Sequence, residues 1–240
     1  MKRLLSGIFV IYTLLFTVPV SADTIYTIND TWNDWPGFTS NIPNQDELGT
    51  PQIDRMMVTL NGSGLLTKVD IVLHDNATWQ NFNSLFINSY AINSNNSNWN
   101  DWDYLVHDGS SENPGYTVGT IPGNGIWKVD TNGYAYTMTN TSSGIRNNTP
   151  NGIDNNDLGL TPLSSGTAWN NNANQLIYSY SFQNLGINID LSQGGFLAFA
   201  PFCANDVIGG SVNPVPEPAT MLLLGLGLLA LSGISRRKKW

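Results

Sequence analysis

The sequence predicts an all-β protein in which residues 23–212 form one exported domain, an antiparallel β-sandwich or a jelly-roll-like fold. Two observations lead to this prediction. Between these positions no long stretch has apolar residues recurring at spacings of three and four, the pattern of an amphipathic helix. Short runs rich in β-branched and aromatic residues recur instead between clusters of Asn, Gly, Ser and Thr. Roughly nine strands over about 190 residues is an ordinary size for one such domain.

The strands are expected where these runs fall. Alternation is clearest in "QLIYSYSF", where Leu176, Tyr178, Tyr180 and Phe182 share one face and the residues between them face the other way. Between two runs, "NGSG" at 61–64 supplies glycines for a hairpin connection. The runs are residues 55–60, 66–75, 85–92, 102–108, 125–130, 134–139, 175–182, 187–191 and 195–202.

The amino end is predicted to be a cleavable signal peptide, residues 1–22. Lys2 and Arg3 precede an apolar stretch over 4–18, and Ala22 ends a run of small residues of the kind that signal peptidase recognises. We expect cleavage after Ala22, which makes the secretion machinery and signal peptidase expected partners. The alternative is an uncleaved amphipathic or buried segment.

The exported portion is strongly acidic. Residues 23–218 hold eighteen acidic residues and four cations, so their net charge is near −14. Such a surface repels phosphate groups, and nucleic acid and anionic lipid headgroups are therefore not expected partners. Cys203 is the single cysteine, which excludes an internal disulfide. It is expected to be a small buried apolar residue, with a reactive or intermolecular thiol as the alternative.

The residues that could carry catalysis form no recognisable motif. His74 and His107 each end a predicted strand and precede an aspartate, which is typical of a strand leading into a polar turn and too small a set for a metal site. A Ser-His-Asp arrangement could be assembled, but no serine lies in a nucleophile-elbow context. The sequence predicts a non-catalytic protein, with a secreted hydrolase as an alternative. Paired carboxylates for glycoside hydrolysis could come from Asp101, Asp103, Asp108 and Glu112.

Two loops offer oxygen ligands for calcium at alternating or nearly alternating positions. They are "NWNDWDY" at 98–104 and "NGIDNNDLG" at 151–159, and neither has the twelve-residue EF-hand pattern. No cofactor is predicted, because solvated loops explain both sequences; structural calcium is the alternative. The calcium candidates are Asp101, Asp103, Asp154 and Asp157.

The tetrapeptide "WNDW" occurs twice and supplies candidates for contact with glycans. Exposed indoles could stack on sugar rings, whereas buried indoles would fill the core of a sandwich. A spacing of three residues does not decide between these two interpretations. The four tryptophans are Trp32, Trp35, Trp99 and Trp102.

The carboxyl end, residues 213–240, differs in composition from the domain before it. Residues 219–235 are uncharged and mostly apolar, and a helix over them would be about 26 Å long at 1.5 Å per residue, close to the ~30 Å hydrocarbon core of a bilayer. A transmembrane helix is predicted there, with a buried helix as the alternative. The positive-inside rule keeps the following cations in the cytoplasm and places the β-domain on the other side. These cations are Arg236, Arg237, Lys238 and Lys239.

The combination of a proline-flanked glutamate, an apolar helix and a basic end resembles a PEP-CTERM protein-sorting domain. The resemblance covers only the tail, and its motif at 215–220 is Val215, Pro216, Glu217, Pro218, Ala219 and Thr220. It implies export in a Gram-negative-type bacterium, recognition by an exosortase-type membrane transpeptidase and processing near the motif. It also implies delivery from a transient inner-membrane anchor to the envelope, the surface or an extracellular exopolysaccharide matrix.

The function expected from these features is structural or adhesive. The domains upstream of such tails vary widely, so the resemblance implies a destination and leaves the work of residues 23–212 open. A carbohydrate-binding module for exopolysaccharide is the first alternative, and the secreted hydrolase is the second.

Overall fold

The protein is almost entirely β-structure. The computed structural model describes residues 22–30, 35–36, 52–74, 83–89, 99–108, 117–120, 122–130, 133–139, 149–159, 169–172, 176–201, 204, 206–213 and 225–229. Its named elements are β1 (Thr24–Asn29), β2 (Ile53–Leu60), β3 (Leu66–Leu73), β4 (Asn83–Asn88), β5 (Tyr104–His107), β6 (Thr117–Val118), β7 (Gly125–Lys128), β8 (Tyr136–Thr139), β9 (Pro150–Ile153), the 3-10 helix η3 (Asn155–Asp157), β10 (Trp169–Asn172), β11 (Ile177–Ser181), β12 (Gly195–Pro201) and β13 (Ile208–Val212).

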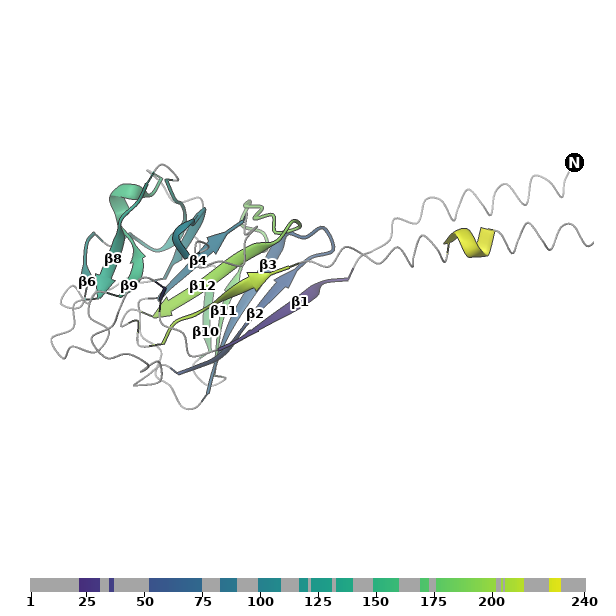
Figure 1. Ribbon diagram of the computed structural model, residues 1–240, viewed down its shortest axis with the longest axis horizontal. Coiled ribbons are helices and arrows are strands. Elements are labelled where there is room, and N and C mark those ends of the chain that lie inside the picture. The colour runs from purple at the N-terminus through teal and green to yellow at the C-terminus, as the bar shows by residue number, and fades with distance from the viewer. Residues whose placement is uncertain are drawn as a thin grey trace, which may run out of the picture.

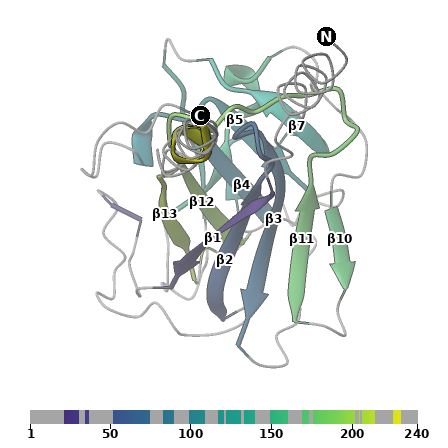
Figure 2. The same ribbon diagram turned by 90° about the vertical axis from the view of Figure 1, so that its right-hand side faces the viewer.

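The strands form three antiparallel sheets. Sheet I has the order β1-β2-β3-β11-β10, and sheet II has the order β13-β12-β4-β5-β7. Figure 2 shows sheet I in front of sheet II. Sheet III is smaller, with the order β6-β8-β9, and lies at one end of the molecule in Figure 1. The prediction of an antiparallel all-β fold is confirmed.

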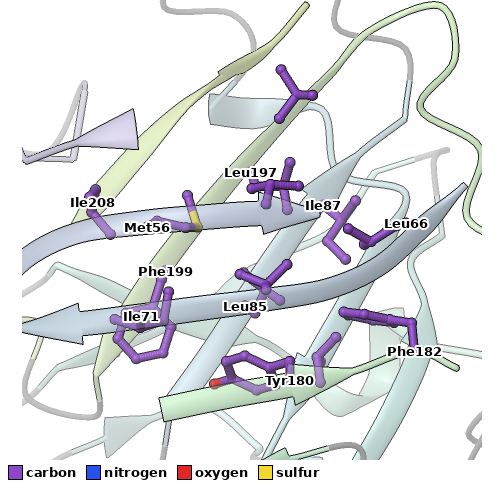
Figure 3. Packing of buried hydrophobic residues seen from close by; sticks show 14 of the residues in the cluster. Met56, Leu66, Ile71, Leu85, Ile87, Tyr180, Phe182, Leu197, Phe199 and Ile208 are labelled. Atoms are coloured by element: carbon purple, nitrogen blue, oxygen red, sulfur yellow. The ribbon is translucent and has the colours of Figure 1, made fainter. Parts of the chain in front are cut away.

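Sheets I and II enclose the larger hydrophobic core, which we call the first core. Met56 and Ile71 of sheet I lie across from Leu85, Leu197 and other apolar side chains of sheet II (Figure 3). The alternation predicted in "QLIYSYSF" is confirmed, because Tyr178, Tyr180 and Phe182 are all buried in this core. Burial of these apolar faces on two sheets is the interaction that holds a sandwich together.

A second core covers the opposite face of sheet II, so that sheet is buried on both sides. Because successive residues of a strand face opposite ways, Leu85 and Ile87 enter the first core while Phe86 enters the second. Ile153 of β9 brings sheet III into the second core. Every residue of β12 is buried, which explains its nearly continuous apolar sequence "GFLAFAP". The layered arrangement thus exceeds the predicted sandwich by one sheet.

The ends of the folded body lie close together at what we call its proximal end. Thr24 at the start of β1 pairs with Leu60, which leads into the hairpin at 61–64, and Val212 at the end of β13 pairs with Gly195. The Leu191 N–H, just before β12, donates to the Gly64 carbonyl oxygen at 2.9 Å, so the hairpin and the start of β12 meet at this end. Figure 1 shows β1 and β13 running side by side, with sheet III at the other end of the molecule.

The predicted membrane segments lie mostly outside the described residues. That is true of residues 1–21, and also of 219–224 and 230–235 within the predicted transmembrane helix. Residues 225–229 are helical and expose Leu226, Leu228 and Leu229. Among the residues that the structure describes, no helix is both long enough and apolar enough to cross a membrane.

Candidate functional site

The tryptophans considered for glycan contact lie inside the protein where the structure describes them. Trp35, Trp99 and Trp102 are 0%, 7% and 1% exposed, and all three belong to the second core. The Trp35 ring contacts that of Trp99 in a T-shaped arrangement, with centroids 4.8 Å apart. This burial does not fit glycan stacking on an exposed indole face. It fits the alternative, in which the indoles fill the core. Trp32 lies outside the described residues.

The residues from which a Ser-His-Asp arrangement could be assembled face opposite sides of sheet II. His107 Nδ1 lies 3.2 Å from Ser84 Oγ, and both side chains are buried. They lie beneath sheet III, since a Cβ added to Gly152 of β9 would be 3.4 Å from Ser84 Oγ. Burial lowers the pKa of His107 from 6.5 to about 3, so its imidazole is neutral at ordinary pH. The next residue, Asp108, accepts hydrogen bonds from the hydroxyls of Tyr178 and Tyr180, on the sheet I side.

The calcium candidates of the 151–159 loop hold backbone N–H groups. Asp154 Oδ2 accepts from the Thr120 N–H at 3.0 Å and its Oδ1 accepts from the Asn156 N–H at 3.0 Å. Partial burial would raise the pKa of Asp154, but these hydrogen bonds outweigh it and the pKa is lowered. Asp157 Oδ2 accepts from the Ala135 N–H at 2.7 Å. Asp154 thus connects the loop to Thr120, which follows β6, and Asp157 connects it to Ala135, which precedes β8.

The candidates in the 98–104 loop are arranged differently. Asp101 is exposed, whereas Asp103 Oδ2 accepts hydrogen bonds from both the N–H and the Oγ of Ser89, each at 2.6 Å. In the described part of the chain, no three His, Cys, Asp or Glu side chains come together as a metal site would require. Glu112 lies outside the described residues.

A polar cleft lies at the proximal end, and the segment at 187–191 builds one of its walls. Ile189 and Leu191 point into the first core, while the alternate residues Asn188 and Asp190 are exposed. The Leu66 N–H donates to the Ile189 carbonyl oxygen at 2.9 Å, and Leu65 forms an isolated bridge with Asp190. The predicted strand at 187–191 is therefore replaced by a short irregular pairing that has the same alternation.

The cleft has a volume of about 270 Å³ and lies between this segment and the adjoining ends of β4 and β5. Tyr104, which is half-buried at the edge of the first core, gives it an aromatic surface. Lys128 Nζ lies 5.7 Å from the centroid of the Tyr104 ring, within cation–π range. The lining residues are Ser89, Tyr104, Asn188, Asp190 and Gln193.

Asp190 provides a fixed negative charge in the cleft. The Ser192 hydroxyl and the Ser192 N–H donate to this carboxylate, the N–H to Oδ1 at 2.8 Å, and these hydrogen bonds lower its pKa. An ionised carboxylate accepts strong hydrogen bonds from hydroxyl groups of a ligand. Sequence reasoning did not single out this site. The signal available for it was the alternation in "INIDL", which predicts two polar side chains on one exposed face.

The comparison with known families identifies the tail. Residues 214–239 match the family model described as the PEP-CTERM protein-sorting motif. The tail is a PEP-CTERM protein-sorting motif. The predicted resemblance is thereby confirmed, and it covers the carboxyl end alone. Searches of curated proteins and of solved structures found no match.

The PEP-CTERM motif implies how the protein is handled. A protein with this tail is exported, is processed by an exosortase at the membrane and reaches the envelope or surface. The last described residue before the motif is Asn213, which directly follows β13. In the described part of the chain, the last strand, β13, is therefore separated from the matched tail by one residue.

Proposed function

We propose that the β-domain is a non-catalytic structural or adhesive body that the PEP-CTERM tail delivers to the cell surface or its surrounding matrix. The position of the sorting motif immediately after the last strand is the observation that supports this proposal best. Val215 lies three positions after Val212, a reach of about 10 Å for an extended chain. The folded body must therefore stay close to the membrane until the tail is processed.

The interior of the domain supports a structural role. His107 and Asp108 are buried and bonded to neighbouring strands, and the carboxylates of Asp103 and Asp154 accept hydrogen bonds from backbone N–H groups of other segments. Two cores hold three sheets without a disulfide. A domain of this kind gives a surface protein a rigid and protease-resistant body.

Fractionation of producing cells followed by intact-mass measurement tests the sorting step. The expected mature chain begins at Asp23 and ends between Pro216 and Thr220, either unmodified or joined to another group. Mature chains that keep the four terminal cations and stay in the inner membrane would contradict the proposal. The Glu217→Gln variant should accumulate unprocessed, and Glu47→Gln is the matched control that should be processed normally.

Two further measurements test the role of the body. Cells lacking the protein should adhere to surfaces less than the parent strain does, and restoring the chain should restore adhesion. Purified mature protein should release no reducing ends from polysaccharides. Turnover that disappears in the Asp103→Asn variant would establish the hydrolase instead.

A further inference from the structure

We propose that the cleft lined by Ser89, Tyr104, Asn188, Asp190 and Gln193 is a binding site for a neutral saccharide chain. This inference rests on the proposed function, because it gives the adhesive body a ligand class and a place to bind it. It also assigns recognition to residues other than the tryptophans that the sequence suggested.

The first argument is the combination of side chains in the cleft. A sugar ring has apolar C–H faces and an equator of hydroxyl groups, so it needs an aromatic surface with hydrogen-bonding groups around it. Tyr104 is the aromatic side chain among the lining residues. The amides of Asn188 and Gln193 can both donate and accept, and the Asp190 carboxylate, which already accepts from Ser192, has lone pairs left for ligand hydroxyls.

The second argument is that the cleft is held in place before any ligand arrives. Asn188 and Asp190 alternate with Ile189 and Leu191, which are 1% and 0% exposed in the first core. Ser89 is fixed by its two hydrogen bonds to the Asp103 carboxylate. The backbone that carries Asn188 and Asp190 and the side chain of Ser89 are thus held before binding, which lowers the conformational entropy lost when a ligand binds.

The third argument concerns charge. Residues 23–218 carry a net charge near −14, and the cleft itself contains the ionised Asp190. Polyanionic saccharides would be repelled by both. The nearby cation, Lys128, lies over the Tyr104 ring. These charges favour a neutral polymer over one that carries carboxylate or sulfate groups.

The fourth argument is size. A volume of about 270 Å³ is slightly below the ~300–1,000 Å³ of pockets that enclose whole small molecules. The cleft therefore suits a short part of a longer chain.

The experiment uses the mature protein isolated from producing cells, with cellohexaose, laminarihexaose and maltohexaose as neutral probes and polygalacturonate as the anionic comparator. Binding is followed by calorimetry and by amide chemical shifts. At least one neutral hexasaccharide should bind at millimolar concentration or below, and polygalacturonate should not. Absence of binding by all three neutral probes, or preference for the anionic polymer, would overturn the proposal.

Matched variants locate the binding in the cleft. Tyr104→Ala and Asp190→Asn should each lower affinity at least 10-fold, while Tyr104→Phe retains the ring and should bind almost normally. Tyr26→Ala is the control for Tyr104, because both tyrosines are half-buried against the first core. Asp101→Asn is the control for Asp190, since both carboxylates are exposed. Wild-type affinity in the Tyr104→Ala and Asp190→Asn variants would also refute the site.

The same variants separate this inference from the proposed function. If cells with Tyr104→Ala protein adhere normally and cells without the protein do not, the adhesive role stands and the cleft is not its binding site. If cells without the protein adhere normally, the adhesive role fails whatever the purified protein binds. Surface delivery is measured in each strain, so that a loss of sorting is not taken for a loss of binding.

Discussion

The hydroxyl of Tyr136 joins two tryptophans of the second core. It donates to the Trp99 carbonyl oxygen at 2.6 Å and accepts from Trp102 Nε1 at 2.9 Å. Burial raises the pKa of Tyr136, with a further contribution from Tyr134, so the phenol stays protonated and can serve as donor and acceptor together. One side chain of β8 thus fixes the loop that precedes β5.

Removing this hydroxyl should weaken the fold. We expect Tyr136→Phe to lower the free energy of unfolding by about 1–3 kcal/mol, because Trp102 Nε1 would lose its acceptor in the core. Tyr134→Phe is the matched control. The Tyr134 hydroxyl has longer contacts, 3.4 Å to the backbone nitrogen of Trp102 and 3.4 Å to the Tyr136 hydroxyl. Its loss should therefore lower the free energy of unfolding by less. Urea denaturation measures both, and equal losses would contradict the assignment.

His107 should make stability depend on pH. Its pKa in the folded protein is about 3, below the value of 6.5 for the unfolded chain. Below pH 6.5 the unfolded chain therefore binds a proton that the folded protein does not, and stability is lost as the pH falls from 6.5 toward 3. The loss attributable to His107 approaches about 1.4 kcal/mol per pH unit.

The His107→Asn variant isolates this contribution, because the carboxylates are common to both proteins. The difference in unfolding free energy between wild type and variant should shift in favour of the variant on acidification through this range. A difference that stays constant from pH 7 to pH 4 would show that His107 does not titrate in this way.

The spacing of Trp99 and Trp102 in the sequence did not predict which way their side chains point. Trp99 and Trp102 both enter the second core, although their separation of three residues fits neither face of a strand in particular. They precede β5 in a turn, so their directions depend on Trp35, Phe86 and Phe196, which come from distant parts of the chain. The abundance of aromatic residues predicted that they would pack together. Which tryptophans are buried depends on their contact partners in the folded chain, which the local sequence does not show.

Among the elements, the hairpin at 61–64 confirms its prediction and has a further role. The Asn61 side chain accepts from the Ser63 and Leu65 N–H groups, and Gly64 has a φ of +79°. A Cβ at Gly64 would lie 2.5 Å from Cβ of Ser192, in the turn after the 187–191 segment. The hairpin and that turn therefore fit together only because residue 64 is glycine.

We expect Gly64→Ala to cost more than about 1 kcal/mol of stability, since alanine opposes both the positive φ and the contact with Ser192. Gly123→Ala is the control, because a Cβ there meets nothing within 4 Å. Thermal unfolding of the two variants decides the point, and a Gly64→Ala protein as stable as Gly123→Ala would contradict it. Saccharide binding should also weaken in Gly64→Ala if the displaced turn carries Gln193 with it.

The elements that sequence patterns predicted are those with large apolar side chains. β3, β5, β7, β8, β11 and β12 fall within predicted runs, while β2 and β4 overlap theirs and begin two residues earlier. The strand β13, "IGGSV", was not predicted because of its glycines, yet a Cβ at Gly209 would lie 2.5 Å from the Trp99 ring and one at Gly210 would lie 2.6 Å from Ile28. Close packing requires glycine at these two positions, and glycine lacks the large side chains by which a strand is recognised in a sequence. The strand β10, "WNNN", also lacks a strand signal because its sequence is mostly asparagine, and it pairs with β11.

For the molecule as a whole, the sorting tail and the folded body should be separable at Asn213. A chain ended after Asn213 keeps β13 and should unfold at nearly the same temperature as the longer protein. A chain ended after Asp206 lacks β13, which contributes Ile208 and Val212 to the first core and pairs with the start of β12. We expect it to lose cooperative unfolding, as measured by calorimetry. Equal melting temperatures for both truncations would contradict this division.

The order of strands also determines when the protein can finish folding during export. The neighbours β1, β2 and β3 follow one another in the chain, so their part of sheet I can pair early. Sheet II cannot close in that way, because β12, the strand between β13 and β4, begins only at Gly195. Since the sorting motif begins almost immediately after β13, an export that starts at the amino end would deliver the final strands just before the tail. Completion of the fold and arrival of the processing signal would then be nearly simultaneous, and an exosortase would meet a body that has only just closed.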